Sequence, residues 1–276
     1  MDLRFDVNIS LLFTELPFLE RPAAAAGHGF DVIESWWPFT AAVPASNEVD
    51  SMVRAIEDAG VRLHALNFYS GDMPAGERGL VSVPSRSAEF RDSVAALVDI
   101  ARLTGCRLFN ALYGVRQPGV DAASQDELAI ENLAFAAQAV AALGGTVLLE
   151  PLARHENGSY PLTSPSEVCS VIDRVMAETG NSNIGLLADF YHLTRNGHAW
   201  RDVIDGYVHR FGHVQIADAP GRHQPGTGDI DFPALFGTLS AAGYGGHVGI
   251  EYRPEGPTEE SFSWLPAAER STERRP

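Results

Sequence analysis

The chain has 276 residues, with 36 acidic side chains against 20 Lys and Arg and a formal charge of −16 at pH 7. Every one of those 20 is arginine, which excludes a lysine Schiff base, a pyridoxal phosphate anchor and a Walker-type phosphate loop. The acidic excess disfavours nucleic acid and anionic membrane surfaces as partners. Two cysteines, Cys106 and Cys169, lie outside any CxxC pair, which argues against a disulfide framework and fits a reducing compartment.

The sequence pattern predicts neither a signal peptide nor a membrane span. Residues 1–6 alternate charged and apolar side chains and lack the apolar centre of a signal peptide. The most apolar stretch, Ala134–Leu149, is interrupted by Gln138 and Gly144 and is too rich in alanine to read as a membrane span. We therefore expect a cytoplasmic protein.

Short runs rich in aliphatic and β-branched residues alternate with longer helical patterns along the whole chain. The candidate strands are Arg4–Ile9, Asp31–Ser35, Arg62–Asn67, Arg107–Asn110, Thr146–Glu150, Ile184–Asp189, His213–Asp218 and His247–Glu251. Eight strand–helix units in a chain of this length predict a closed parallel (β/α)8 TIM barrel, a single domain over residues 1–276. An open doubly wound sheet is the alternative, and the first strand is not followed by the GxGxxG of its dinucleotide-binding form.

Three helices are clearest between these strands. Ser85–Thr104 is closed by Gly105, Asp121–Leu143 begins at a capping aspartate and ends at a glycine, and Thr163–Glu178 opens with Ser and Pro. The tail at residues 255–276 is expected to form one C-terminal helix and then fray.

Polar residues occur at the ends of the last four predicted strands, namely Glu150, Asp189, Gln215 and Glu251. In a parallel barrel these ends emerge on the face that carries active sites, so the four side chains should converge. One acidic residue at a strand end also fits capping of the next helix, but four polar ends on consecutive strands are harder to explain that way. Four oxygen donors suit Mg²⁺ or Mn²⁺ better than zinc. Without a cation, bound protons would have to compensate three packed carboxylates.

Motifs spread over nearly the whole chain carry a family resemblance. They are the segments 5–13, 71–79, 149–151, 188–192, 213–218, 224–228 and 249–252. On these motifs the chain resembles the hydroxypyruvate isomerase family, within the xylose-isomerase-like barrel group that also holds ketose 3-epimerases and endonuclease IV. The resemblance implies a barrel fold, with Glu150 and Glu251 as the catalytic pair. Similarity to the epimerases implies Glu150, Asp189, Gln215 and Glu251 as metal ligands, with Gln215 where those enzymes place His.

Candidate substrate-binding residues surround this set. By the same resemblance, His192 and Arg222 match substrate-contacting positions, and Arg222 can pair with a carboxylate. Glu156 matches a residue that binds a substrate hydroxyl in the epimerases, although a solvated loop charge is an equal alternative. Asn8 and Asn67 end strands one and three and can hydrogen-bond substrate oxygens.

Some loops depart from the family pattern. Residues 153–159 replace the usual Asn and Asp-x-Pro-Gly stretch after the first Glu-Pro, and Met73 stands where Trp is common. The pair Trp36-Trp37 either walls the pocket or packs at a subunit interface or in the core. The loop 219–228 is either a mobile lid or a connector, and Glu77 beside Arg78 can form an ion pair that orders its loop.

These features predict an isomerase for a small sugar acid, converting hydroxypyruvate to tartronate semialdehyde by proton transfer through an enediolate. A 2-oxo-tetronate isomerase or a ketose 3-epimerase would use the same residues, and a non-catalytic sugar-acid-binding barrel is the alternative outside enzymes. A small molecule is the expected partner, and a homo-oligomer is possible. Five histidines, His64, His155, His213, His223 and His247, are scattered in sequence and are assigned structural or surface roles.

Overall fold

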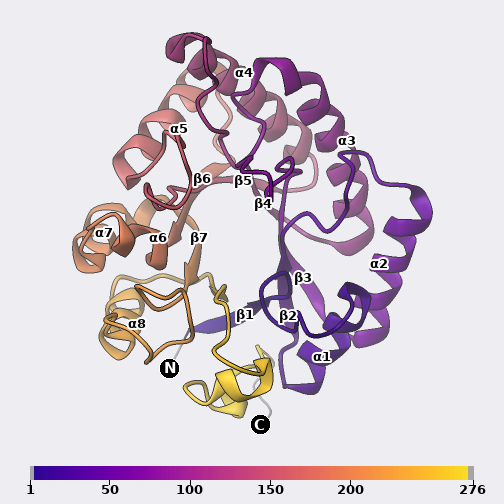
Figure 1. The fold of residues 1–276 in the computed structure, drawn as a ribbon, viewed down its shortest axis with the longest axis vertical. Coiled ribbons are helices and arrows are strands. Elements are labelled where there is room, and N and C mark those ends of the chain that lie inside the picture. Colours follow the sequence, from indigo (N-terminus) through magenta and orange to yellow (C-terminus); the bar gives the residue numbers. More distant parts are fainter. Residues whose placement is uncertain (1–2, 273–276) are drawn as a thin grey trace.

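A computed structural model describes residues 3–272 of the chain. Eight parallel strands form a closed barrel in sequence order, surrounded by helices (Figure 1). The strands are β1 (Arg4–Asn8), β2 (Val32–Ser35), β3 (Arg62–Asn67), β4 (Leu108–Asn110), β5 (Thr146–Leu149), β6 (Ile184–Asp189), β7 (Phe211–Ile216) and β8 (His247–Ile250). The predicted (β/α)8 TIM barrel is confirmed, as a single domain.

The pairing of the first strand with the last excludes the open-sheet alternative. Residues Arg4 to Val7 of β1 lie in parallel register with His247 to Ile250 of β8. Because this pair completes the ring, all eight carboxyl ends emerge on one face, and residues at those ends are brought together from the whole chain.

The α-helices that cover the barrel are α1 (Arg21–Gly27), α2 (Ser46–Ala59), α3 (Ser87–Thr104), α4 (Ala122–Ala141), α5 (Pro165–Thr179), α6 (Phe190–Arg195), α7 (Trp200–Tyr207) and α8 (Phe232–Ala241). Short 3₁₀ turns are η1 (Phe18–Glu20), η2 (Pro84–Arg86), η3 (Val208–Arg210), η4 (Thr258–Phe262) and η5 (Ala267–Glu269). The predicted caps are present: Asp121 accepts from the backbone N–H of Ser124, and Ser164 from that of Glu167.

The expected C-terminal helix is wrong. After β8 the described chain contains only η4 and η5. Pro254, Pro257 and Pro266 explain this, because each lacks a backbone N–H and disfavours helix at the residue before it. The segment lies between α8 and α1, where the outer ring is completed (Figure 1). The rest of the expected frayed end, residues 273–276, lies outside the described residues.

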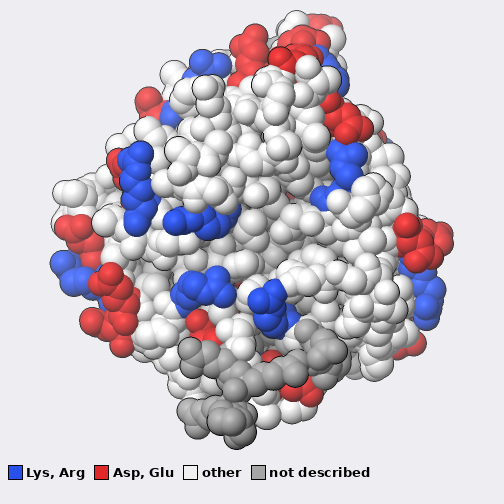
Figure 2. All heavy atoms as spheres, turned by 180° about the vertical axis from the view of Figure 1, so that it is seen from behind, with Lys and Arg blue, Asp and Glu red and all other residues white. Residues whose placement is uncertain are grey.

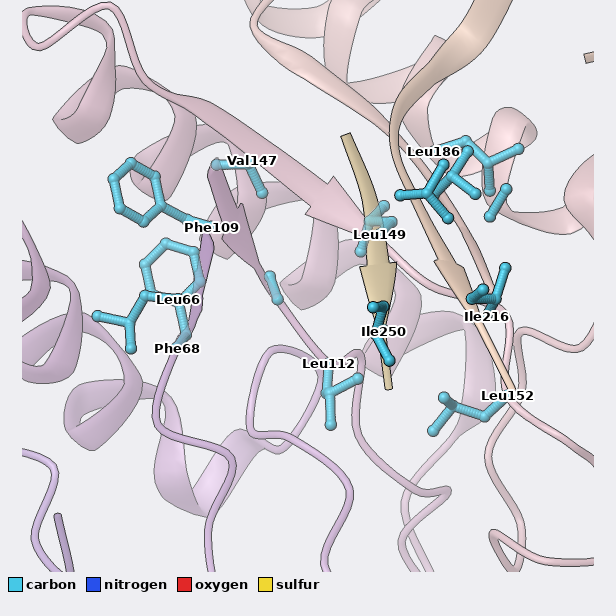
Figure 3. Packing of buried hydrophobic residues seen from close by; sticks show 14 of the residues in the cluster. Leu66, Phe68, Phe109, Leu112, Val147, Leu149, Leu152, Leu186, Ile216 and Ile250 are labelled. Carbon is cyan, nitrogen blue, oxygen red and sulfur yellow. The ribbon is translucent and has the colours of Figure 1, made fainter. Parts of the chain in front are cut away.

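The apolar core lies between the barrel and its helices. Leu66, Phe109 and Val147 occupy one level on β3, β4 and β5 and are essentially inaccessible to solvent. Figure 3 shows these side chains among the buried residues of this layer. Their neighbours Asn67 and Asn110 alternate with them and point into the barrel, as the two-residue period of a strand requires. This alternation leaves the inner ends of the strands to polar residues.

The surface charge is unevenly arranged. Seen from behind, the molecule carries basic side chains towards the middle of that face, while acidic ones lie mostly towards its rim (Figure 2). Within residues 3–272, none of the helices has the length and apolar composition needed to cross a bilayer.

Candidate active site

A pocket of about 520 Å³ is lined by residues from the carboxyl ends of the strands and the loops that follow them. Six of the predicted site residues line it, namely Asn67, Glu150, Glu156, His192, Arg222 and Glu251. The other two, Asp189 and Gln215, are buried against them: Asp189 Oδ2 lies 3.7 Å from His192 Nε2, and Gln215 Nε2 lies 3.3 Å from Glu251 Oε1. The eight residues predicted from sequence are therefore brought to one place.

Glu150 and Glu251 are almost fully buried and are held by different donors. Asn110 Nδ2 donates to Glu150 Oε2 over 2.8 Å. Trp36 Nε1 donates to Glu251 Oε1 over 2.7 Å, and Asn8 Nδ2 donates to the same oxygen over 3.0 Å. The two side chains are thereby fixed in orientation without any direct hydrogen bond between them among the described contacts.

Burial controls the protonation of both carboxyl groups. It raises the pKa of Glu150 well above its ordinary value, and the negative charges of Glu251 and Asp189 raise it further. Burial also raises the pKa of Glu251, to about 7, although the positive charge of Arg222 opposes the rise. Two buried carboxyl groups with raised pKa in one pocket are suited to general acid–base chemistry.

Asp189 joins the start of α6 to the pocket. Its Oδ1 accepts from the backbone N–H groups of Tyr191, at 2.7 Å, and His192, at 3.4 Å, which caps the helix. Its Oδ2 is buried and accepts no hydrogen bond within residues 3–272. That atom is left facing His192 and the Arg222 guanidinium, each 3.7 Å away.

The histidine after Asp189 has a defined neutral form. Nδ1 of His192 accepts from the backbone N–H of Ala153 over 3.1 Å, so a single ring proton must be on Nε2. Burial and the charge of Arg222 hold the pKa of His192 well below its ordinary value. Nε2 lies 3.7 Å from Glu150 Oε1 as well as from Asp189. His192, predicted from its position to contact substrate, therefore also lies against the carboxylates of Glu150 and Asp189.

The donor set fits a divalent cation. Gln215 uses its Nε2 to donate to Glu34 Oε1 over 2.7 Å, which leaves its buried Oε1 without a hydrogen-bond partner among the described residues, like Asp189 Oδ2. Unpartnered buried oxygens beside raised-pKa carboxyl groups are what an oxygen-ligated ion would satisfy. Glu150, Asp189 and His192 can also each place one ligand atom within 4.8 Å of the others.

Arg222 compensates part of the negative charge, a role that the sequence did not reveal. Its guanidinium donates to Glu251 Oε2 and lies 5.2 Å from the ring centre of Tyr191. The arginine has a φ of +60°, the left-handed region that is uncommon for residues other than glycine. From the sequence, only a metal ion or bound protons were expected to offset the negative charge of the carboxylates. The structure adds a fixed positive charge beside Glu251 and Asp189.

The loop that carries Arg222 is fastened at its base. The carboxylate of Asp218, an expected strand-end residue, accepts from the backbone N–H groups of Gly226, Gly228 and Ile230 instead of reaching the pocket. The backbone N–H of Arg222 donates to the carbonyl of Asp218 over 2.8 Å. The loop is therefore an ordered support for Arg222.

Glu156 is engaged by neighbours at the rim. It accepts from the hydroxyl of Tyr191 at 2.8 Å and from Arg195 Nε at 2.8 Å. The neighbouring Asn157 accepts from Arg78 Nε, so the divergent loop 153–159 is tied to the loop 71–79 across the pocket. The expected ion pair within Glu77-Arg78 is wrong, because Glu77 pairs with Arg86.

Glu34 is the main residue that sequence reasoning left out of the site. It is 1% exposed and accepts from Asn8 Nδ2 (3.0 Å), Gln215 Nε2 (2.7 Å) and His213 Nε2 (2.7 Å). Its position near the end of a predicted strand was a signal, since the polar strand ends elsewhere in the chain marked the site. Trp36 lines the pocket, the first of the two alternatives for the Trp36-Trp37 pair, while Trp37 Nε1 donates to the carbonyl of Ala41.

Comparison with known proteins identifies the family to which the chain belongs. The model of the xylose isomerase-like TIM barrel family matches residues 22–268. The chain belongs to this family. A Streptomyces coelicolor protein that is provisionally named a hydroxypyruvate isomerase is 50% identical over 98% of each chain. The hydroxypyruvate isomerase of Escherichia coli is 32% identical over 95% of this chain and 98% of its own, and the 2-oxo-tetronate isomerase of Cupriavidus necator is 34% identical over 95% and 97%.

Solved structures of this barrel family agree with the fold. A Brucella melitensis protein described as an AP endonuclease of family 2 has a TM-score of 0.86 and 34% identity, covering 95% of this chain and 98% of its own. D-psicose 3-epimerase of Clostridium cellulolyticum has a TM-score of 0.74 over 96% and 91% of the two chains. At 19% identity this second likeness shows the fold alone.

Proposed function

We propose that this isomerase interconverts hydroxypyruvate and 2-hydroxy-3-oxopropanoate (tartronate semialdehyde). The observation that carries the proposal is the pair of buried carboxyl groups, Glu150 and Glu251, both lining one pocket and both with raised pKa. Full-length relatives named hydroxypyruvate isomerase and 2-oxo-tetronate isomerase support a small 2-oxo acid as the substrate.

The charges around the pocket suit an acid substrate. Arg78, Arg222 and Arg253 all line it, and guanidinium groups bind carboxylates through paired N–H donors. A volume of about 520 Å³ is ample for a three- or four-carbon acid. We place the substrate carboxylate on the arginine side and its reacting carbons towards Glu150 and Glu251.

The reaction needs a proton to move between neighbouring carbons. One carboxylate removes a proton from C3 of hydroxypyruvate, and the resulting enediolate takes a proton at C2, while the proton of the C3 hydroxyl passes to the C2 oxygen. Glu150 and Glu251 are the proposed proton carriers, with the neutral His192 Nε2–H beside Glu150 as a donor to a substrate oxygen. Trp36 and Asn110 hold the two carboxyl groups in place.

A divalent cation is the proposed cofactor, held by Glu150, Asp189, Gln215 and Glu251, with Mg²⁺ or Mn²⁺ as the ion. When bound, such an ion stabilises negative charge on the substrate oxygens. The buried, unpartnered oxygens of Asp189 and Gln215 support this assignment.

The test is deuterium exchange in D₂O over a panel of three- to six-carbon substrates. Hydroxypyruvate should acquire deuterium at its reacting carbons and give the aldehyde product. Glu251→Gln and Glu150→Gln should each lower the rate by roughly 10² to 10⁴, as expected for loss of a general acid or base. A fully active Glu251→Gln enzyme would overturn the assignment. Glu260→Gln, an exposed carboxylate of η4, is the matched control.

The same panel separates the alternatives. The named 2-oxo-tetronate isomerases favour a four-carbon 2-oxo acid as the second candidate, and faster turnover of that substrate would select it. Exchange at C3 of a ketose without a carbonyl shift would mark an epimerase, and ligand binding without exchange would mark a non-catalytic barrel. Dialysis against EDTA followed by Mg²⁺ or Mn²⁺ tests the cofactor, because activity independent of either ion would overturn the cation's role.

A further inference from the structure

A second group of metal-binding side chains lies inside the barrel below the candidate active site. Asp6 on β1, His64 on β3 and His213 on β7 can each place one ligand atom within 4.8 Å of the others. Asp6 precedes Asn8 by two residues and His213 precedes Gln215 by two, so the strand period puts them on the same inner face, one layer deeper. His64, His213 and His247, which are scattered in sequence, thus lie side by side in the barrel interior.

Asp6 has no hydrogen-bond partner in this layer. The residue is 0% exposed, and neither of its carboxylate oxygens accepts a hydrogen bond from any described residue. Nδ1 of the fully buried His213 is likewise without a partner. A buried carboxylate and a buried ring nitrogen are costly to leave unsatisfied, so their presence together indicates a bound group between them.

The imidazoles of His64 and His247 are neutral, the form that binds metal, whereas the carboxylates of Asp6 and Glu34 outweigh burial and raise the pKa of His213. Burial lowers the pKa of His64 to about 2 and that of His247 to about 4. The His64 ring lies 4.3 Å from that of His247 and 5.5 Å from that of His213, measured between ring centres. Nδ1 of His64 faces Arg62 at 3.3 Å, which leaves its Nε2 for a ligand, and the buried Nε2 of His247 lacks a described partner.

The local charges permit a cation despite Arg62. Asp6 and Glu34 are both buried in this part of the barrel and both act on His213 through their negative charge. Nη1 of Arg62 lies 3.3 Å from Nδ1 of His64, and the positive charges of Arg62 and Arg4 both act on this histidine. Two buried carboxyl groups thus act at this position, against the guanidinium groups of Arg62 and Arg4.

We propose that Asp6, His64 and His213 bind a divalent transition-metal ion of the Zn²⁺ class inside the barrel, separate from the candidate active site. One carboxylate with two imidazoles is a borderline-soft donor set, which favours Zn²⁺, Co²⁺ or Ni²⁺ over Mg²⁺. His247, beside His64, is the further imidazole of the site.

The ion would connect this layer to the one above it. With the metal on Nδ1, the ring proton of His213 is on Nε2, which lies 2.7 Å from Glu34 Oε2. Glu34 then accepts a fixed hydrogen bond and in turn receives those of Asn8 and Gln215. The metal is a positioning element for the active site, acting through its ligand His213.

Titration with Co²⁺ tests the proposal, because its visible absorption reports the donor set. Full-length protein freed of metal by chelation should bind two equivalents of Co²⁺. The Glu150→Gln, Glu251→Gln double variant should retain one equivalent, which Zn²⁺ displaces and a large excess of Mg²⁺ does not. Asp6→Asn should weaken that equivalent by on the order of 100-fold. His209→Asn, an exposed histidine of η3, is the matched control and should bind like the parent.

Thermal unfolding keeps the test independent of activity. Asp6→Asn replaces a buried, unpartnered carboxyl group with a neutral amide of similar size, so the metal-free variant should be folded and at least as stable as the parent, while Zn²⁺ no longer raises its Tm. His64→Gln, at a partly accessible position, provides a second variant with the same expected loss. The proposal would be overturned if the active-site double variant bound no Co²⁺. It would also be overturned if neither Asp6→Asn nor His64→Gln changed Co²⁺ binding.

Discussion

Glu34 shows how one buried carboxylate sets the orientation of several neighbouring polar side chains. Its two oxygens receive hydrogen bonds from an asparagine on β1 and from a glutamine and a histidine on β7. The glutamine is Gln215, whose remaining oxygen is thereby turned away from Glu34. A donor set proposed to bind a cation is thus oriented by a residue that does not itself line the pocket.

The sequence identified the residues at strand ends but not the network behind them. Glu150, Asp189, Gln215 and Glu251 could be predicted to converge because the carboxyl ends of parallel strands share one face. The contacts of Glu34 could not be predicted, since they depend on register between strands that are far apart in the chain. Register is set by packing of the whole ring and leaves no local pattern.

Gly249 makes room for Glu34, which leads to a prediction at this scale. A Cβ at position 249 would lie 2.7 Å from Glu34 Oε2, and Glu34 is held by three donors and cannot easily move away. Gly249→Ala should therefore lower kcat/KM for the proposed substrate by roughly 10- to 100-fold, as loss of supporting contacts does. It should also lower the Tm, measured by thermal unfolding.

The matched control is Gly237→Ala on α8, where an added Cβ would have no atom within 4 Å. That variant should keep full activity and gain roughly 0.5–1 kcal/mol of stability from the better helix former. Equal behaviour of the two alanine variants would contradict the proposed role of Gly249.

At the scale of elements, capping and proline explain both the correct and the wrong predictions. The starts of α4 and α5 were found because Asp121 and Ser164 are local signals whose partners lie three residues away. The prediction of a C-terminal helix was wrong because the prolines of that segment prevent a helix that the other residues would favour. The short turns η4 and η5 nevertheless occupy the place of the last outer helix, so the ring of cover is complete without one.

The start of α5 gives a pH-dependent prediction. Burial raises the pKa of Glu167, but hydrogen bonds from the backbone N–H of Thr163 and from Ser164 outweigh it and leave the pKa below its ordinary 4.5. A carboxyl group with a lowered folded-state pKa stabilises the fold above its unfolded-state pKa and loses that contribution as the pH falls. Glu167→Gln should thus cost about 0.5–1 kcal/mol at neutral pH.

Urea unfolding at a series of pH values measures this difference. The free energies of unfolding of the parent and of Glu167→Gln should converge as the pH falls from 4.5, where the carboxyl group of the unfolded chain becomes protonated, through the lower folded-state pKa, where that of the folded protein is protonated too. Glu260→Gln is the control, and its free energy of unfolding should match that of the parent at every pH in the series. A constant gap between parent and Glu167→Gln would contradict the capping role.

At the scale of the whole molecule, the C-terminal segment packs against the beginning of the chain. Phe262 of η4 is fully buried and packs against Phe30 and Phe13, with ring centres 5.0 and 5.8 Å apart. Arg270 lies over the same ring and donates to the carbonyl of His28. The segment after β8 is thereby fixed to the segments on either side of α1.

Phe262 should accordingly be one of the most sensitive positions outside the site. Phe262→Ala should lower the free energy of unfolding by about 3–5 kcal/mol, through lost burial and the cavity left behind. Phe262→Leu, which keeps most of the volume, should cost less than about 1.5 kcal/mol. Urea unfolding measures the free energy of unfolding of both variants. If Phe262→Ala lost less of it than Phe262→Leu, the segment would not hold the barrel together.

The parallel pairing of β1 with β8 has a consequence for how the site comes into being. It joins the two strands that are farthest apart along the chain, a contact whose loop-closure entropy is repaid only late in folding. Asn8 comes from the first of these strands, and Glu251 directly follows the last. An intermediate with an unclosed ring would hold Glu150 and Asp189 on adjacent strands yet lack their counterpart across the pocket. Recovery of activity during refolding should therefore report closure of the ring and lag behind the recovery of helical signal.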